Sequence, residues 1–503
     1  MVGLSGDVRL QSVLGRRLGV LPLVGVLVLA MVRPAVAGSV SLVDASTGTS
    51  PFASCRDIGP LNGSNDFNTV NTEIEPRMAI DPTNADTMIA VYQQDRWRNG
   101  GARGLVASIT RNGGTAWSIT SPSFSQCSGN PEWNRASDPW VTFDPAGNAY
   151  FIALTSNADE THSGILVSKL DHNQLASKNK KLEWSAPVTL IDTFGGTLGL
   201  GFNDKESITA DPTRPGTVYA VWDQSSVPGE DRIPGVLHAF SYRQETLFSR
   251  TTDFGATWST PKALFFSNQV TIGNQIVVEP NGNLADFFWA SKGSGIQPNE
   301  NSDHQAAMYS SDGGLHWSPP SIVSDSFPLR VVDPNSGFPI RAGTNIPDVG
   351  VDPNSGALYV VWADGRWSGF THDDIALTKS TDGGKTWSPA QKVNQTPNGA
   401  AAFTASAHVL ADGTVGVTYY DFRNNNGNGL NTDYFLVTST DGGVSWSETR
   451  LTPSSFNMEW APISRGYFTG DYEGLTSAGS QWRAVFIQTV ALRDTDAFVA
   501  ATP

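Results

Sequence analysis

The chain has 503 residues, of which 39% are hydrophobic and 16% are charged, and its formal net charge is −15. Such an acidic chain is a poor candidate for binding nucleic acid or an anionic membrane, because both are negatively charged. The 50 glycines and 30 prolines, together with many runs rich in Val, Thr, Tyr and Trp, predict an all-β fold with many turns.

Residues 1–37 are predicted to be a signal peptide. Arg16 and Arg17 precede an apolar run over residues 18–32, and residues 35–37 (Ala-Val-Ala) have the small-x-small pattern of a cleavage site. The run is short for a membrane span, and a retained anchor is the alternative. Cleavage removes four arginines and one aspartate, which leaves a net charge of −18. We therefore expect a secreted or periplasmic protein without a membrane span.

Both cysteines, Cys55 and Cys127, lie in the mature chain. In an oxidising compartment we expect them to form one disulfide, which stabilises the fold by roughly 4 kcal/mol in the chain-entropy model. Two unpaired thiols are the alternative. The cysteines and histidines show no spacing typical of a metal site.

A short motif recurs five times along the chain. Its clearest copy is KSTDGGKTWSP at residues 379–389, with the core Asp-x-Gly-x-x-Trp. Apolar runs precede the copies, so we expect hairpin turns in which Asp accepts backbone N–H bonds, Gly takes a positive φ and Trp packs against the hairpin. The motif is therefore interpreted as structural. The Asp (or Asn) and Trp positions are Asn112 and Trp117, Asp253 and Trp258, Asp312 and Trp317, Asp382 and Trp387, and Asp441 and Trp446.

A second repeat lies between these turns. It consists of an apolar run, an Asp-Pro or Asp-Gly turn and a longer apolar run, and its copies are about 59 to 73 residues apart. Together the two repeats give units of four antiparallel strands, A to D, which are typical of β-propeller blades. The seven copies begin at Arg77, Pro139, Ser207, Gln275, Asp348, Ala407 and Tyr472.

We predict a single all-β propeller of four-stranded antiparallel blades over residues 75–503. Seven blades are preferred and six are the alternative. Residues 38–74 are expected to form a closing strand and strap, in which the segment around residues 39–45 supplies strand D of the last blade. That closure would leave no open sheet edge.

The motif Ser/Thr-x-Asp-x-Gly-x-Thr-Trp is similar to the Asp-box, or bacterial neuraminidase repeat. Over most of residues 70–500 the chain resembles the sialidase superfamily of propellers. The resemblance implies a glycoside hydrolase that removes terminal residues, such as sialic acid, from glycans. Asp-boxes also occur in propellers without activity, so a non-catalytic glycan- or protein-binding scaffold is the alternative. A second alternative is a polysaccharide lyase that uses His238 and Tyr242 in the blade-three loop.

The expected partner is a glycan, and a monomer is expected. No cofactor is required, although the carboxylates could hold a structural Ca²⁺ ion. The strand directions place the D–A and B–C connections on one face of the propeller and the Asp-boxes on the other. We therefore expect the site among the A-strand entrances and the B–C loops, where clustered carboxylates would raise one another's pKa.

In the family that the chain resembles, a Tyr nucleophile is activated by a Glu, an Asp is the acid/base, and three Arg hold the substrate carboxylate. This resemblance implies Asp138 as the acid, with Glu206 and Tyr472 beside it. The family's early Phe/Tyr-Arg-Ile-Pro motif has no equivalent here, because residues 232–234 (Arg-Ile-Pro) fall inside the blade-three loop. The candidate substrate-binding residues are Arg77, Arg366, Arg423, Trp97 and Trp367.

Overall fold

The structure is a computed structural model. It describes residues 40–46, 48–55, 67–177, 179–195, 201–226, 243–265, 270–291 and 303–502. The predicted signal peptide, the Arg-Ile-Pro segment, His238 and Tyr242 lie outside these ranges. None of the described helices is long and apolar enough to cross a membrane.

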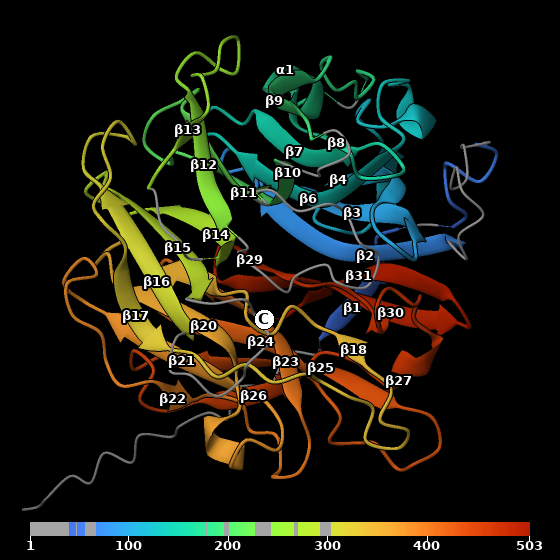
Figure 1. Ribbon diagram of the computed structural model, residues 1–503, viewed down its shortest axis with the longest axis vertical. Coiled ribbons are helices and arrows are strands. Elements are labelled where there is room, and N and C mark those ends of the chain that lie inside the picture. Colours follow the sequence, from blue (N-terminus) through green and yellow to red (C-terminus); the bar gives the residue numbers. More distant parts are fainter. Residues whose placement is uncertain are drawn as a thin grey trace, which may run out of the picture. The chain divides into compact units, whose positions relative to one another are not determined.

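The strands form consecutive antiparallel runs of four, which are coloured in sequence order in Figure 1. The first runs are β2 (Asn68–Ile80), β3 (Thr87–Trp97), β4 (Ala102–Arg111) and β5 (Ser118–Thr120); β6 (Arg135–Phe143), β7 (Ala149–Ser156), β8 (His162–Leu170) and β9 (Val188–Phe194); and β10 (Phe202–Ala210), β11 (Val218–Ser226), β12 (Arg243–Thr251) and β13 (Lys262–Ala263). The next runs are β14 (Val270–Val278), β15 (Leu284–Ser291), β16 (Asp303–Ser310) and β17 (Ser321–Asp325); β19 (Asp348–Val351), β20 (Leu358–Asp364), β21 (Asp374–Ser380) and β22 (Gln391–Lys392); and β23 (Ala402–Val409), β24 (Val415–Asp421), β25 (Asn431–Ser439) and β26 (Ser447–Arg450).

The last run combines both ends of the described chain. Its strands are β29 (Gly474–Ala478), β30 (Gln481–Ala491), β31 (Asp494–Ala501) and the N-terminal β1 (Ser41–Asp44). β1 pairs antiparallel with β31, with Ser41 opposite Ala501, which is the pairing that the sequence predicts (Figure 1). Among the described residues no sheet closes on itself, and two pairs of neighbouring runs are joined by a single backbone pair each, Thr72 with Thr495 and Ala102 with Ala136.

The first strand of each run contacts the first strand of the next. β2 contacts β6, and the series continues through β10, β14, β19, β23 and β29 until β29 contacts β2. Two shorter pairings lie outside the runs. β18 (Ile340–Arg341) pairs parallel with β28 (Tyr467–Phe468), and β27 (Phe456–Asn457) pairs with β25.

Few helices interrupt the strands. In the described residues, the connection between β8 and β9 begins with a short α-helix, and the other helical turns are 3-10 helices. These elements are α1 (His172–Leu175), η1 (Gln126–Ser128), η3 (Arg366–Ser368) and η4 (Met458–Trp460).

Each Asp-box lies at the turn between the third and fourth strands of its run, as expected. In the copy between β21 and β22, the carboxylate of Asp382 accepts hydrogen bonds from the Ser380 hydroxyl (2.8 Å), the Thr386 backbone N–H (3.0 Å) and the Thr386 hydroxyl (2.6 Å). Trp387 packs edge-on against Phe287 of the preceding run, with 5.9 Å between ring centres. The motif therefore fixes a turn and links two runs, and its polar groups are used by the turn itself.

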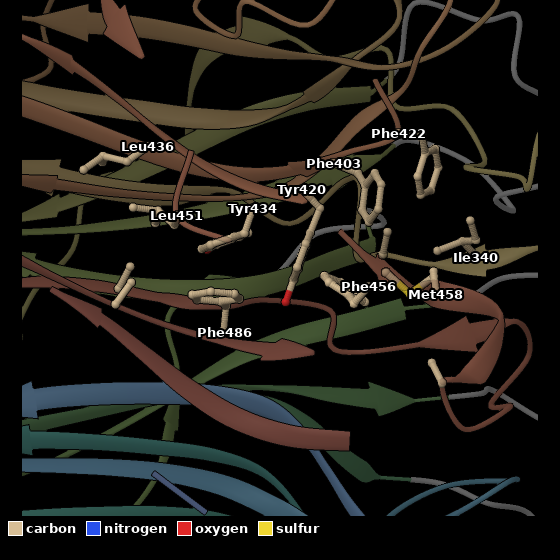
Figure 2. Packing of buried hydrophobic residues seen from close by; sticks show 14 of the residues in the cluster. Ile340, Phe403, Tyr420, Phe422, Tyr434, Leu436, Leu451, Phe456, Met458 and Phe486 are labelled. Atoms are coloured by element: carbon tan, nitrogen blue, oxygen red, sulfur yellow. The ribbon is translucent and has the colours of Figure 1, made fainter. Parts of the chain in front are cut away.

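Apolar side chains from facing sheets fill the space between neighbouring runs. Figure 2 shows the largest such cluster, which lies between the β23–β26 and β29–β31 runs. There Tyr434 and Phe486 stack with 4.3 Å between ring centres, and the Tyr420 hydroxyl lies 2.8 Å from the Glu473 carboxylate. Ile340 of β18 also packs into this cluster, so the core anchors the segment that carries the neighbouring Arg341.

The predicted disulfide between Cys55 and Cys127 is present. Both cysteines pack at the edge of an apolar cluster that includes Phe52, Tyr92 and Ile487. The bond therefore ties the segment after β1 to the connection between β5 and β6, next to the place where the two ends of the chain meet.

Candidate active site

The first strands of five runs carry a bulge at the same position. The residue at each bulge has a positive φ: Glu75 (54°), Asp138 (50°), Lys205 (50°), Gly273 (77°) and Thr404 (53°). A register shift between the first and second strands occurs at each of these sites. Positive φ costs a non-glycine residue roughly 1–3 kcal/mol, and such strain concentrates at functional sites.

The bulge residues Glu75 and Asp138, together with Asp471, meet at the ammonium group of a third bulge residue, Lys205. Lys205 Nζ lies 2.5 Å from Asp138 Oδ1, 2.9 Å from Asp471 Oδ2 and 3.2 Å from Glu75 Oε1. The Lys205 side chain is 7% exposed. Because the three carboxylate oxygens contact the same nitrogen atom, they also lie close to one another. The bulges therefore gather acidic groups from separate strands into one cluster.

Arg341 of β18 completes this cluster. Its Nε donates to Asp471 Oδ1 at 3.0 Å, and its guanidinium lies 4.2 Å from the centre of the Phe468 ring. Burial would raise the pKa of Asp471, but Arg341 and Lys205 outweigh burial and hold that pKa well below its usual value. The Arg341 side chain is 20% exposed, more than Lys205 or Asp471, so the cluster meets solvent on its side.

Arg96, at the end of β3, is buried without a carboxylate partner. Among the described residues its hydrogen bonds go to neutral groups, namely Gln93 Oε1 (2.6 Å), Ser137 Oγ (3.4 Å) and Ser464 Oγ (3.4 Å). Burial, and then the nearby Arg341, lower the pKa of Arg96 to about 10. Arg341 also donates to Ser464 Oγ, at 3.3 Å, so the two guanidinium groups flank one hydroxyl.

Arg77 lies at the other side of the cluster. Its guanidinium is 3.7 Å from the centre of the Trp140 ring and 4.9 Å from that of Tyr472, and it forms a 2.7 Å ion pair with Asp348. A cavity of about 10 Å³ is lined by Arg77, Trp140, Lys205, Glu206 and Tyr472 together with five residues of the neighbouring strand and loop. Four sequence candidates, Arg77, Asp138, Glu206 and Tyr472, therefore belong to one region.

Glu206 and Tyr472 are both buried, with 2% and 5% exposure. Within the described residues, neither carboxyl oxygen of Glu206 has a hydrogen-bond partner, and the Tyr472 hydroxyl has none either. Burial raises the pKa of Glu206, and the negative charge of Asp138 raises it further. Burial also raises the pKa of Tyr472, and the carboxylates Glu75, Asp138 and Glu206 add to that shift. Two groups with raised proton affinity therefore lie beside each other.

A larger cavity, of about 330 Å³, meets this region at Arg77. Its walls come from the first strands of the runs, and Pro82, Pro145 and Pro212 of the first-to-second-strand turns line it as well. It therefore extends toward the face that carries those turns, whereas the sequence placed the site on the opposite face. Its volume lies in the range typical of small-molecule sites.

The structure places Arg366 and Trp367 in a separate loop after β20. Arg366 Nε donates to Asp364 Oδ1 and its Nη2 to Asp364 Oδ2, both at 2.8 Å. Trp367 is 36% exposed, and the Arg366 guanidinium lies 5.3 Å from its ring centre. No contact among the described residues joins this pair to the Lys205 cluster.

Arg423 and Trp97 are also held by local partners. Arg423 forms ion pairs with Asp421 (2.6 Å) and Glu448 (2.5 Å) and lies 3.8 Å from the centre of the Phe435 ring. Trp97 is 5% exposed, and the Arg135 guanidinium lies 4.7 Å from its ring centre. Neither is placed against the cluster, and Trp97 offers no exposed face on which a sugar could stack.

Five members of the cluster were not among the sequence candidates: Glu75, Lys205, Asp471, Arg96 and Arg341. The first three lie at first-strand entrances, where the sequence indicated acidic and basic residues, but nothing in the pattern showed that they meet. Arg341 lies in a connection outside the repeat, so periodicity gives no signal for it.

In the part of the chain that the structure describes, no set of three or more His, Cys, Asp or Glu side chains is arranged to hold a metal ion. The clustered carboxylates Glu75, Asp138 and Asp471 surround an ammonium group instead.

A family model described as the BNR/Asp-box repeat matches residues 379–389. The chain carries the Asp-box repeat. The Asp-box repeat expected from the motif is thereby confirmed for this copy. No curated protein sequence matches the chain.

Several solved structures are similar to this chain at low identity. A Hadza microbial sialidase is 16% identical over 84% of this chain and 74% of its own, with a TM-score of 0.46. An alpha-L-arabinanase from Penicillium chrysogenum, complexed with arabinobiose, is 11% identical over 92% of this chain and 98% of its own, with a TM-score of 0.45. A Trypanosoma rangeli sialidase with the inhibitor DANA is 14% identical over 80% of this chain and 59% of its own, with a TM-score of 0.43. Likenesses of this size assign no substrate to this chain.

Proposed function

We propose that the protein is an exported, sialidase-like glycoside hydrolase built on a seven-bladed propeller. The observation that supports this most is the gathering of Arg77, Asp138, Glu206 and Tyr472 from separate strands into one strained, buried region. The succession of contacts from β2 through β29 and back to β2, with β1 as the last strand of the final run, supports the blade number.

The groups at this site can carry out a two-step displacement. Tyr472 Oη attacks the anomeric carbon while Glu206 takes its proton, and Asp138 gives a proton to the leaving glycosidic oxygen. Water then attacks the same carbon, gives a proton to Asp138, and releases the tyrosine oxygen, which recovers its proton from Glu206. The raised pKa of Tyr472 makes a neighbouring base necessary, and the raised pKa of Glu206 makes its carboxylate a strong base.

A sugar with a negative charge fits the charges of this region best. Arg96 is buried with neutral partners alone, and Arg341 flanks the same Ser464 hydroxyl from the partly exposed side. A carboxylate bound between the two guanidinium groups would supply the charge that Arg96 lacks. We therefore propose an acidic sugar, such as sialic acid, as the terminal residue that is removed.

A panel of fluorogenic glycosides tests this function on the purified mature protein. We expect turnover of a sialoside, little turnover of neutral glycosides, and a loss of about 10²–10⁴-fold in kcat/KM for Asp138→Asn and Glu206→Gln. Asp412→Asn, an exposed turn aspartate, is the matched control and should retain full activity. Turnover that survives in both site variants would place the chemistry elsewhere.

A non-catalytic glycan- or protein-binding scaffold is the second candidate. Its support is the burial of the cluster, since Glu75, Asp138 and Lys205 are each less than 10% exposed and the two carboxylates already pair with the ammonium group. This function predicts glycan binding by calorimetry without turnover of any member of the panel. If the protein holds a structural Ca²⁺ ion, a chelator lowers its Tm. A product that absorbs in the ultraviolet, formed from a uronate polymer, would instead indicate a lyase.

A further inference from the structure

Lys205 occupies a position that the proposed chemistry does not use. Its backbone has a φ of 50° at the β10 bulge, and its ammonium group contacts carboxylates from β2, β6 and the segment before β29. It also lies 5.5 Å from the centre of the Tyr472 ring. A lysine side chain that only covered apolar surface would keep its charged end in water. This one carries its charge into the interior.

The charges around Lys205 do not balance within its first contacts. Glu75, Asp138 and Asp471 supply three carboxylates, whereas Lys205 and Arg341 supply two positive charges. Asp471 contacts both cations, and Asp138 makes the shortest contact with the ammonium group. Glu75 makes the longest of the three contacts, and its second oxygen accepts a hydrogen bond from the neutral Gln93 amide.

We propose that Lys205 is a positioning residue of the candidate site, which holds Asp138 and Asp471 in place, and that Glu75, in addition to the acid/base Asp138, takes up and releases a proton. The catalytic role that this inference gives Lys205 rests on the proposed function. The uptake and release of a proton by Glu75 does not depend on that function.

The groups that face Glu75 support this assignment. Burial raises the pKa of Glu75 to about 7; Lys205 and Arg341 act against that rise, and Asp138 and Asp471 add to it. Asp204, on the same strand as Lys205, is half-buried, and desolvation raises its pKa to about 6. The remaining charged neighbours of the cluster include Arg77, Arg96, Glu206 and Glu473.

The backbone argues against a purely structural ion-pair cluster. Three successive first strands, β2, β6 and β10, each keep a non-glycine residue in the left-handed region, where glycine would avoid the strain. The fourth, β14, has Gly273 at the same position. The strained positive φ therefore occurs at the residues whose side chains reach the cluster, namely Glu75, Asp138 and Lys205. Thr404 of β23 has a similar φ and donates instead to the Ala342 carbonyl.

The test compares the wild-type protein with Glu75→Gln, Lys205→Met and Lys205→Arg, with Lys392→Met as control. Lys392 also pairs with a buried aspartate, Asp374, at 2.6 Å, but it lies outside the cluster. Unfolding by urea is followed from pH 4 to pH 9. Because the folded pKa of Glu75 is raised, the stability that it contributes is present below pH 4.5 and is lost as the pH rises through about 7.

The difference in unfolding free energy between wild type and Glu75→Gln should therefore change across that window. In Lys205→Met the midpoint should move up by about one to three pH units, since an opposite charge in contact has gone, and Lys205→Arg should restore it. Lys392→Met should leave the midpoint unchanged. A flat wild-type minus Glu75→Gln difference would overturn the proposal, as would an unmoved midpoint in Lys205→Met. If Lys205→Met does not fold, the isosteric Glu75→Gln comparison still decides.

The pH dependence of the hydrolysis rate is the second measurement. On any glycoside that the wild type hydrolyses, the pH–rate limb near pH 7 should be lost in Glu75→Gln and displaced in Lys205→Met, and Lys205→Arg should recover it. If the wild type hydrolyses nothing in the panel, the proposed function fails while the unfolding data still test Lys205 and Glu75. If hydrolysis is normal and the limb is unchanged in both variants, the inference fails and the function stands.

Discussion

Asp286, in β15, has a buried carboxyl group that gives the fold no hydrogen bond among the described residues. It is fully buried, and neither carboxyl oxygen has a hydrogen-bond partner among the described residues. Its strand neighbours are the apolar Ile276 and Met308. Burial raises its pKa well above the usual 3.8, and the charge of Asp223 raises it further. Replacing Asp286 with valine should therefore stabilise the protein.

The gain from Asp286→Val has two parts. Removing a buried polar group without a partner is worth about 1–3 kcal/mol at every pH. The second part depends on pH, because the unfolded chain releases the proton at a much lower pH than the folded protein does. The stability contributed by the neutral carboxyl is complete below pH 3.8 and is lost as the pH rises toward the folded pKa. The advantage of valine should grow by about 1.4 kcal/mol per pH unit in that range.

Urea unfolding at pH 4, 5, 6 and 7 measures both parts. Asp286→Asn is the matched control, since it keeps a polar group of the same shape but cannot titrate. It should show the pH-dependent gain without the constant gain. A valine variant whose advantage is the same at all four pH values, or one that is less stable than wild type at pH 7, would refute this reasoning.

Three other predictions concern the turns, the disulfide and the charge of the substrate. Asn112 already accepts a bond from the Ala116 backbone N–H, and the double substitution Asn112→Asp with Ala116→Thr should add about 0.5–1.5 kcal/mol by supplying the carboxylate–hydroxyl bond that three of the other copies have; an unchanged Tm would contradict this. Replacing Cys55 and Cys127 with serine should lower the unfolding free energy by about 4 kcal/mol, as judged by chemical denaturation, because the bond closes a loop with a separation of 72 residues. Arg96→Met should raise KM about 10- to 100-fold for an acidic sugar substrate and leave any neutral substrate unaffected, in steady-state kinetics; equal effects on both would count against an anion site.

Most of the fold could be predicted from the sequence, because it repeats. The Asp-x-Gly-x-x-Trp turns and the alternating runs between them mark where each group of four strands begins and ends. The pairing of β1 with β31 followed from a last repeat that lacked its fourth strand. The disulfide followed from there being two cysteines in a chain predicted to be exported. The turn motifs and the alternating runs are local patterns, which persist in the folded protein wherever tertiary contacts do not override them.

The site was predictable only in part, because tertiary contacts decide which charges are free. Arg366 and Arg423 follow an aspartate at a spacing of two, and each folds back onto that aspartate. At the end of β3, by contrast, the acidic residue Asp95 comes directly before Arg96. The Asp95 carboxylate accepts hydrogen bonds from the Ser50 hydroxyl and from the Asn71 backbone N–H instead. That difference of one residue leaves Arg96 without a carboxylate. It is the signal in the sequence that could have singled out Arg96.

The most direct test of the proposed active site is to trap its covalent intermediate. A fluorinated sialyl fluoride, whose glycosyl–enzyme bond forms readily and hydrolyses slowly, is incubated with the mature protein, which is then digested and analysed by mass spectrometry. The account predicts one glycosyl group per chain, on the peptide that contains Tyr472, and none on Tyr472→Phe. Labelling of a residue outside the Lys205 cluster, or an active enzyme that takes up no label, would contradict it.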